Sequence, residues 1–366
     1  MGGRWGPQRP LPPSTALAPS PPATYAPAMG ALQGKVALVA GATRGAGRGI
    51  ARALGEAGAT VYCTGRSSRA GPAGPADPGD PKRPETIEET AELVTAAGGS
   101  GVAVRVDHTE EAAVERLFER VRADHGRLDV LVNDIWGGDA LTEWGKPFWE
   151  LDVQTGFKMM ERAIHTHVVT SRHGVPLMLD GRGGLVVEVT DGAFHGYRGQ
   201  LFYDLCKLSV IRLAYAMSVE LAETSVTAVA VTPGFLRSEA VLDHFGVSEE
   251  NWRDAVAQDR HFALSETPLL VGRVIAALAA DPSVHTRAGQ VLTCWDLARH
   301  YDVRDVDGAQ PHWDEHLDAA VEEILGGDSP SPDDVLLLKM RRPQLDFDDE
   351  RAAQRARIEA FLKRHG

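Results

Sequence analysis

Short apolar runs recur along the chain, and stretches with the period of an amphipathic helix separate them. The runs are expected as strands at 36–40, 60–64, 101–106, 128–132, 185–189, 226–231 and 290–293. Helices are expected at 50–57, 85–97, 110–125, 155–172 and 203–223. Continuous apolar strands that alternate with helices are typical of a parallel sheet buried on both faces. The pattern therefore predicts an α/β fold with a doubly wound parallel sheet of about seven strands, flanked by helices.

Both ends of the chain depart from this pattern. Residues 1–30 are rich in proline, and we expect a disordered tail because they cannot bury enough apolar surface to offset their ordering entropy. This stretch lacks the apolar segment of a signal peptide, and Met29 is a sensible alternative start. One domain is expected over 31–310, with a surface loop at 67–84. A C-terminal extension, 311–366, ends in a charged helix at 348–364.

Composition and charge narrow the class of protein. The 366 residues are 43% hydrophobic and 24% charged, and no run approaches the 18 apolar residues of a membrane span. The net charge of −13 and the lack of a basic stripe argue against nucleic acid or an anionic membrane as a partner. Three widely spaced cysteines form no C-x-x-C pair, which favours a reducing cytoplasm and disfavours a disulfide framework.

A glycine-rich loop follows the first expected strand. Gly41, Gly45 and Gly47 lie between that strand and the first helix, in the spacing G-x-x-x-G-x-G. Glycine permits a tight turn and lets a diphosphate approach the backbone, and the helix N-terminus offers free N–H groups. A glycine turn alone is weak evidence, but its position between strand and helix predicts a dinucleotide site.

The segment 40–47 resembles the T-G-x-x-x-G-x-G motif of the classical short-chain dehydrogenases/reductases (SDRs), and further family motifs follow in order. Their counterparts are Leu131-Val132-Asn133, Tyr203 and Lys207 in a Y-x-x-x-K pattern, and Pro233-Gly234. Segments 58–62, 64–66, 146–150, 296–299 and 304–308 resemble the subgroup of dehydrogenase/reductase SDR family member 1. The resemblance covers about residues 30–310 and implies a Rossmann-type fold.

The resemblance also implies which residues contact an NAD(P) cofactor. Asp107 would lie at the adenine, and Ser238 is near the family's threonine for the nicotinamide amide. The complete set is Gly41, Thr43, Arg44, Gly45, Gly47, Arg66, Asp107, Asn133, Lys207, Pro233, Gly234 and Ser238.

The second expected strand ends without the carboxylate that would bind an adenosine ribose diol. It ends instead at Arg66, and Arg44 lies in the glycine loop near the same place. Two guanidinium groups can hold a phosphate. We therefore expect NADP(H) in preference to NAD(H), although Arg66 as a solvated loop residue and Arg44 as a turn residue is the alternative.

Tyr203 and Lys207 are the expected acid/base pair. They are four residues apart, so one face of a helix presents both. A free phenol has a pKa of about 10, and a lysine ammonium and an oxidised nicotinamide would lower that pKa. The alternative is an ordinary amphipathic helix with a buried tyrosine and a lysine that reaches solvent.

The family's catalytic serine is missing. Matching 184–191 to the family's G-x-I-V-N-I-S-S pattern places Asp191 at the serine, whereas counting 13 residues back from Tyr203 gives Thr190. A threonine hydroxyl or a protonated Asp191 can donate to a substrate oxygen. An ionised Asp191 cannot donate, and it would raise the pKa of Tyr203. The sequence leaves these alternatives open.

Other family positions also differ. No asparagine lies between Asn133 and Asn251, so the family's helical asparagine is absent, and His165 in that region is a candidate for a proton relay or a structural residue. The histidines lack the spacing of a metal site, so no metal is expected. Trp136, Trp144 and nearby aromatic residues fit an apolar substrate pocket as well as a core or a subunit contact.

These observations predict an NADP(H)-dependent oxidoreductase that interconverts a carbonyl and a secondary alcohol on an apolar small molecule. Tyr203 would be the acid/base, and Thr190 or Asp191 would orient the substrate oxygen. A cytoplasmic homodimer or homotetramer is expected. The alternative is a non-catalytic NADP(H)-binding sensor or scaffold on the same fold, which the missing serine and asparagine favour and the intact Tyr203/Lys207 pair disfavours.

Overall fold

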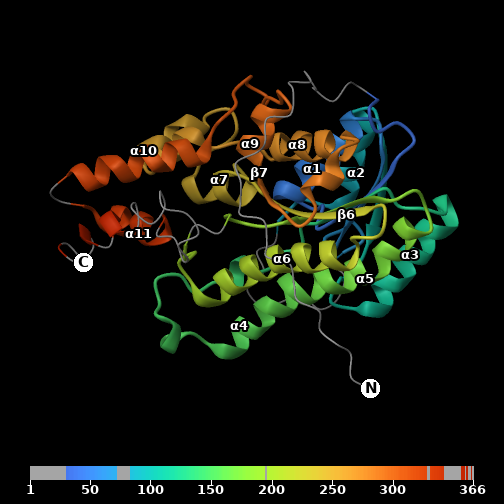
Figure 1. The fold of residues 1–366 in the computed structure, drawn as a ribbon, viewed down its shortest axis with the longest axis horizontal. Coiled ribbons are helices and arrows are strands. Elements are labelled where there is room, and N and C mark those ends of the chain that lie inside the picture. Colours follow the sequence, from blue (N-terminus) through green and yellow to red (C-terminus); the bar gives the residue numbers. More distant parts are fainter. Residues whose placement is uncertain are drawn as a thin grey trace.

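The computed structural model describes residues 30–71, 83–193, 196–327, 330–341 and a few positions between 356 and 364. It shows a parallel sheet between two layers of helices (Figure 1). Seven strands run in the order β3-β2-β1-β4-β5-β6-β7. They are β1 (Val36–Ala40), β2 (Thr60–Gly65), β3 (Ser100–Arg105), β4 (Val130–Asn133), β5 (Gly184–Val189), β6 (Val226–Thr232) and β7 (Val291–Thr293). The predicted doubly wound sheet is confirmed.

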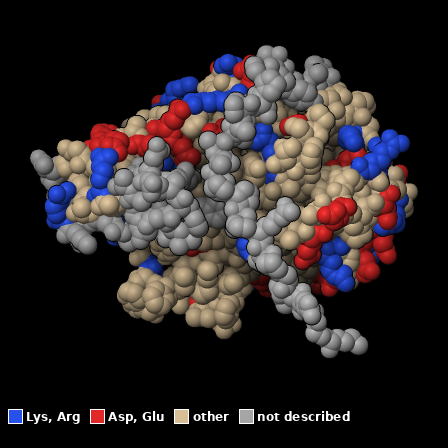
Figure 2. Space-filling view, viewed as in Figure 1, with Lys and Arg blue, Asp and Glu red and all other residues tan. Residues whose placement is uncertain are grey.

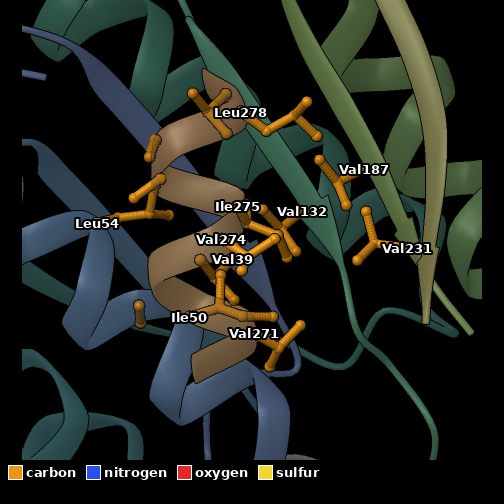
Figure 3. Close-up of a cluster of buried hydrophobic side chains, with 14 of the residues drawn as sticks. Val39, Ile50, Leu54, Val132, Val187, Val231, Val271, Val274, Ile275 and Leu278 are labelled. Atoms are coloured by element: carbon orange, nitrogen blue, oxygen red, sulfur yellow. The ribbon is translucent and has the colours of Figure 1, made fainter. Parts of the chain in front are cut away.

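Helices cover both faces of the sheet (Figure 1). One face carries α1 (Gly45–Glu56), α2 (Ile87–Ala96), α8 (Pro268–Ala280) and α9 (Cys294–His300). The other carries α3 (Glu111–His125), α5 (Thr166–Leu179) and α6 (Leu201–Glu220), with α4 (Val153–Met160) against α6. Figure 3 shows the hydrophobic core on the first face, in which Val39, Val132 and Val187 of the sheet lie near Ile50 of α1 and Ile275 of α8.

Two glycines let α1 and α8 approach closely. A Cβ on Gly49 would lie 2.1 Å from the carbonyl oxygen of Pro268, and one on Gly272 would lie 2.5 Å from that of Gly49. The sequence pattern did not predict α8, because nearly all of its residues are apolar and no polar face marks it as amphipathic. Its start does carry a signal, since Thr267 caps the helix and Pro268 is its first residue.

The helix expected at 155–172 is divided. After α4, residues Glu161–His165 form a π-helical turn, and α5 then continues past Pro176. Such turns often lie near functional sites. Besides α8, four helices in the described part of the chain that follow β6 were not predicted: α7 (Glu239–Phe245), α9, α10 (Trp313–Gly326) and α11 (Pro332–Arg341).

Several expectations about the ends of the chain lie outside the described residues. These are the tail up to residue 29, the part of the insert at 72–82 and most of the charged helix at 348–364. Within the described part of the chain, no helix has the length and apolar character needed to cross a bilayer. The same part shows no cluster of three or more histidine, cysteine or acidic side chains arranged to hold a metal.

Candidate active site

A cavity of about 1550 Å³ opens at the carboxyl ends of the strands, where ligands bind in doubly wound folds. Side chains or backbone that follow β1 to β6 contribute to its wall. The predicted site residues that line it are Gly41, Thr43, Arg44, Gly45, Arg66, Asp107, Thr190, Asp191, Tyr203, Lys207, Pro233, Gly234 and Ser238. The structure thus brings together most of the residues that the sequence singles out, and Gly47 and Asn133 lie behind the wall.

The glycine loop ends in an anion-binding helix N-terminus. Gly41 has a φ of +92°, and a Cβ there would lie 2.3 Å from the carbonyl oxygen of Asp134, so only glycine fits. The helix α1 begins at Gly45, whose N–H donates to Oε2 of Glu239 at 2.7 Å. The Glu239 carboxylate thus occupies a position where such a terminus would hold a phosphate.

Asp134 lies beneath the same loop. Its carboxylate accepts a hydrogen bond from the Gly47 N–H, and its backbone contacts Gly41. Burial raises the pKa of Asp134 to about 7, although Lys207 acts in the opposite direction. The titratable side chain of Asp134 therefore joins the glycine loop to the segment that follows β4.

The Asn133 side chain takes part in a buried network. Its Nδ2 donates to Oγ of Ser171 at 2.9 Å and to Oε1 of Glu188 at 2.8 Å. Oε2 of Glu188 lies 2.5 Å from Nδ1 of His167, and Nε2 of that ring lies 2.9 Å from the carbonyl oxygen of Ile135. Asn133 therefore joins β4 to β5 and α5, and its side chain does not reach the cavity described above.

Tyr203 and Lys207 lie one turn apart on α6. The helix begins where Oε1 of Gln200 accepts the Tyr203 N–H at 2.7 Å. The Tyr203 ring contacts Trp136 and Trp144, with centroid distances of 5.2 and 5.1 Å. Nζ of Lys207 lies 4.2 Å from the centroid of the Trp136 ring. Two of the aromatic residues considered for a substrate pocket therefore flank the phenol.

The structure places Thr190 and Asp191 in different environments. The Thr190 hydroxyl donates to the backbone carbonyl of Lys207 at 2.8 Å, and the residue is 2% exposed. Oδ2 of Asp191 accepts the Tyr203 hydroxyl at 2.6 Å. Oδ1 of the same carboxylate accepts Nη2 of Arg198 at 2.5 Å. Asp191, rather than Thr190, shares a hydrogen bond with the phenol.

These contacts set the charges of the site. Burial alone would raise the pKa of Asp191, but Arg198 outweighs it and lowers that pKa to about 2. Burial, and next the Asp191 carboxylate, raise the pKa of Tyr203 well above its usual value of 10. At neutral pH, Asp191 is therefore ionised and Tyr203 holds its proton.

The sequence reasoning missed several residues of the cavity. Arg198 lies in a loop that carries no motif, and Glu239 reaches the glycine loop from α7. The helices α10 and α11 contribute Trp313, Leu317, Leu336, Leu337, Met340 and Arg341 to the wall. Little in the sequence could place these C-terminal residues, because their position depends on how the extension packs against the domain.

Comparisons with known proteins agree with this geometry. A family model described as short chain dehydrogenase matches residues 81–244. The chain is 35% identical over 282 residues to dehydrogenase/reductase SDR family member 1 of Homo sapiens, and the match covers 76% of this chain and 85% of that protein. The chain belongs to the short-chain dehydrogenase/reductase family. The predicted resemblance is confirmed, and the protein is an NAD(P)-dependent oxidoreductase that acts on a small molecule.

More distant SDR proteins share the fold. The chain is 27% identical over 213 residues to the 3-oxoacyl-[acyl-carrier-protein] reductase FabG of Escherichia coli, covering 57% of this chain and 75% of that one. A crystal structure of a short chain dehydrogenase from Mycobacterium thermoresistibile superposes with a TM-score of 0.62 at 20% identity. That match covers 77% of this chain and 92% of the crystallised one.

Glu239→Gln is expected to tighten NADPH binding by about 2–5-fold, because a carboxylate at a helix N-terminus contributes about 0.3–1 kcal/mol. If the cofactor diphosphate binds at this terminus, as the sequence predicts, it takes the place of that carboxylate at the Gly45 N–H. Titration calorimetry with NADPH measures the change. Glu250→Gln is the control, since Glu250 is an exposed carboxylate that does not line the cavity. Unchanged or weaker binding by Glu239→Gln would show that the two anions do not compete.

Proposed function

We propose that the protein is an NADP(H)-dependent oxidoreductase that interconverts a carbonyl and a secondary alcohol on an apolar small molecule. The observation that supports this most is that the Tyr203 hydroxyl and Lys207 share one cavity with the glycine loop. An acid/base group, a cation and a dinucleotide-type loop are thus positioned around the same space.

The residues of the cavity fit the cofactor. The backbone at Gly41 and Gly45 would bind the diphosphate. The Glu239 carboxylate, which accepts the Gly45 N–H, shows that the α1 terminus can bind an anion. Asp107 lines the adenine end, with its Oδ1 held by the N–H and hydroxyl of Thr109. Pro233, Gly234 and Ser238 line the cavity after β6 and would lie at the nicotinamide end. When bound, the cofactor supplies or accepts the hydride.

The preference for NADP(H) rests on Arg44 and Arg66. Both line the cavity next to β2, and no carboxylate ends that strand. Nη2 of Arg44 is within 3.4 Å of the Ser67 hydroxyl, and its Nε lies 3.8 Å from Oε2 of Glu85. This set of donors suits a 2′-phosphate better than a ribose diol.

NADPH is expected to bind at least tenfold more tightly than NADH, because one charge-assisted contact is worth roughly 1.5–3 kcal/mol. Arg66→Ala should remove much of that difference and leave NADH binding unchanged. Titration calorimetry of both cofactors tests this, with Arg69→Ala as the control because Arg69 is exposed and paired with Glu92. Equal affinities in the wild type would contradict the preference.

In the proposed reaction, Tyr203 exchanges a proton with the substrate oxygen. Lys207 lies beside the phenol, 5.4 Å from its ring centroid, and its charge favours the phenolate. Trp136 and Trp144 give the reacting end an apolar wall, and Leu337 and Met340 of α11 also line the cavity. An apolar substrate therefore fits better than a charged one.

A non-catalytic NADP(H)-binding protein is the second candidate. The ionised Asp191 favours this candidate, because the carboxylate accepts a hydrogen bond from the Tyr203 hydroxyl and cannot donate one to a carbonyl. NADPH consumption over a panel of aldehydes and ketones, with Tyr203→Phe as control, distinguishes the two. Tight NADPH binding without turnover of any carbonyl or alcohol would support the sensor or scaffold. A homo-oligomer and a cytoplasmic location stay predictions.

A further inference from the structure

Besides Tyr203, carbonyl reduction needs a hydrogen-bond donor to the substrate oxygen, and among the described residues neither Thr190 nor Asp191 provides one. The Thr190 hydroxyl is directed to the Lys207 carbonyl and is buried. The Asp191 carboxylate is ionised and can only accept hydrogen bonds. Tyr203 must give up its own proton, so a donor that keeps its proton has to be a group other than Thr190, Asp191 and Tyr203.

Among the described residues, Arg198 supplies a further side-chain donor beside the phenol. Its Nη2 and the Tyr203 hydroxyl bind the two oxygens of the same Asp191 carboxylate, so the guanidinium and the phenol lie next to each other. The backbone N–H of Arg198 donates to Oδ1 of Asp204 at 2.9 Å, which fixes the loop to α6. Arg198 lines the cavity, and its Nε is buried without a hydrogen-bond partner within the described residues.

Other cations of the cavity are placed differently. Nζ of Lys207 lies over the Trp136 ring, and Nη1 of Arg162 donates to the Gly137 carbonyl at 2.8 Å. A guanidinium has five N–H groups in a planar fork, so Arg198 can bind Asp191 and still direct a donor into the cavity.

We propose that Arg198 is a catalytic residue that donates a hydrogen bond to the substrate oxygen, in place of the serine hydroxyl that the family resemblance implies at Asp191 or Thr190. Asp191 positions its guanidinium. This inference rests on the proposed function. In reduction, the carbonyl carbon receives the hydride of the reduced cofactor, and the carbonyl π electron pair moves to the oxygen. That oxygen takes the Tyr203 proton, while Arg198 keeps its own protons and stabilises the developing negative charge.

The first test uses Arg198→Ala with a carbonyl that the wild type reduces. We expect kcat to fall by about 10²–10³, the usual effect of losing one donor to an oxyanion, with little change in NADPH affinity. Millimolar guanidinium chloride should restore part of kcat in this variant and none in Tyr203→Phe. Arg212→Ala, which removes an exposed arginine of α6, should behave like the wild type. A wild-type kcat in Arg198→Ala would overturn the proposal.

A second background separates catalysis from folding. Asp191→Ser restores the hydroxyl, so adding Arg198→Ala to this variant should lower kcat by less than about tenfold. The double variant also leaves no unpaired carboxylate, so it can be tested even if the single Arg198→Ala variant does not fold. A loss of 10²–10³ in this background as well would overturn the proposal, since a hydroxyl then does not replace Arg198. Failure of the proposed function looks different: the wild type turns over no substrate, or Tyr203→Phe matches it.

Discussion

Tyr203→Phe is expected to lower kcat for carbonyl reduction by about 10²–10⁴, the range for removal of a general acid. The variant loses the hydroxyl that donates to Asp191 at 2.6 Å. It keeps the ring that contacts Trp136 and Trp144, so the shape of the cavity should persist. NADPH affinity, measured by titration calorimetry, should stay within about twofold because the proposed cofactor contacts do not involve the phenol.

Tyr215→Phe is the matched control for this prediction. Tyr215 lies on the same helix, about three turns after Tyr203, and its ring contacts Arg212. Its loss of a hydroxyl should leave kcat unchanged. A Tyr203→Phe enzyme that retains the wild-type kcat with a verified substrate would show that another group exchanges the proton.

The strands were predictable because each is apolar along most of its length and lies between helices. The predicted run at 36–40 coincides with β1, and the other strands differ from their predicted runs by one or two residues at one or both ends. The helices α8 and α10 were not predicted for two different reasons. The first is buried on nearly all sides, and the second belongs to an extension whose role depends on long-range packing.

The candidate site was predictable where a motif fixes the position of a residue at the end of a strand or on one face of a helix. Gly41 after β1 and the Tyr203/Lys207 pair on α6 are such cases. The choice between Thr190 and Asp191 was not predictable, because successive residues of an extended chain point in opposite directions. An alignment shift of one residue exchanges their roles. Arg198 was missed because its role depends on an ion pair with Asp191 rather than on any local pattern.

The ion pair has a consequence for the pH dependence of the reverse reaction, alcohol oxidation. In the proposed reaction, oxidation uses the Tyr203 phenolate as base, so its rate should rise with pH through the pKa of that phenol. Burial and the Asp191 carboxylate both raise this pKa. The structure therefore predicts an alkaline profile for oxidation, with reduction favoured at neutral pH, where the phenol keeps its proton.

Asp191→Ser is expected to shift the rising limb of the oxidation profile to lower pH by about one unit or more. The substitution removes a negative charge that is hydrogen-bonded to the phenol and leaves the positive charge of Arg198, which favours the phenolate. At a fixed pH on the limb, each unit of pKa is worth about a tenfold change in the ionised fraction. The profile of kcat for an alcohol substrate measures the shift, and ultraviolet titration of the phenolate measures the same pKa without turnover. Asp243→Ser, an exposed carboxylate of α7, should leave both unchanged. A limb that stays in place or moves to higher pH would show that Asp191 does not act on the phenol in the working enzyme.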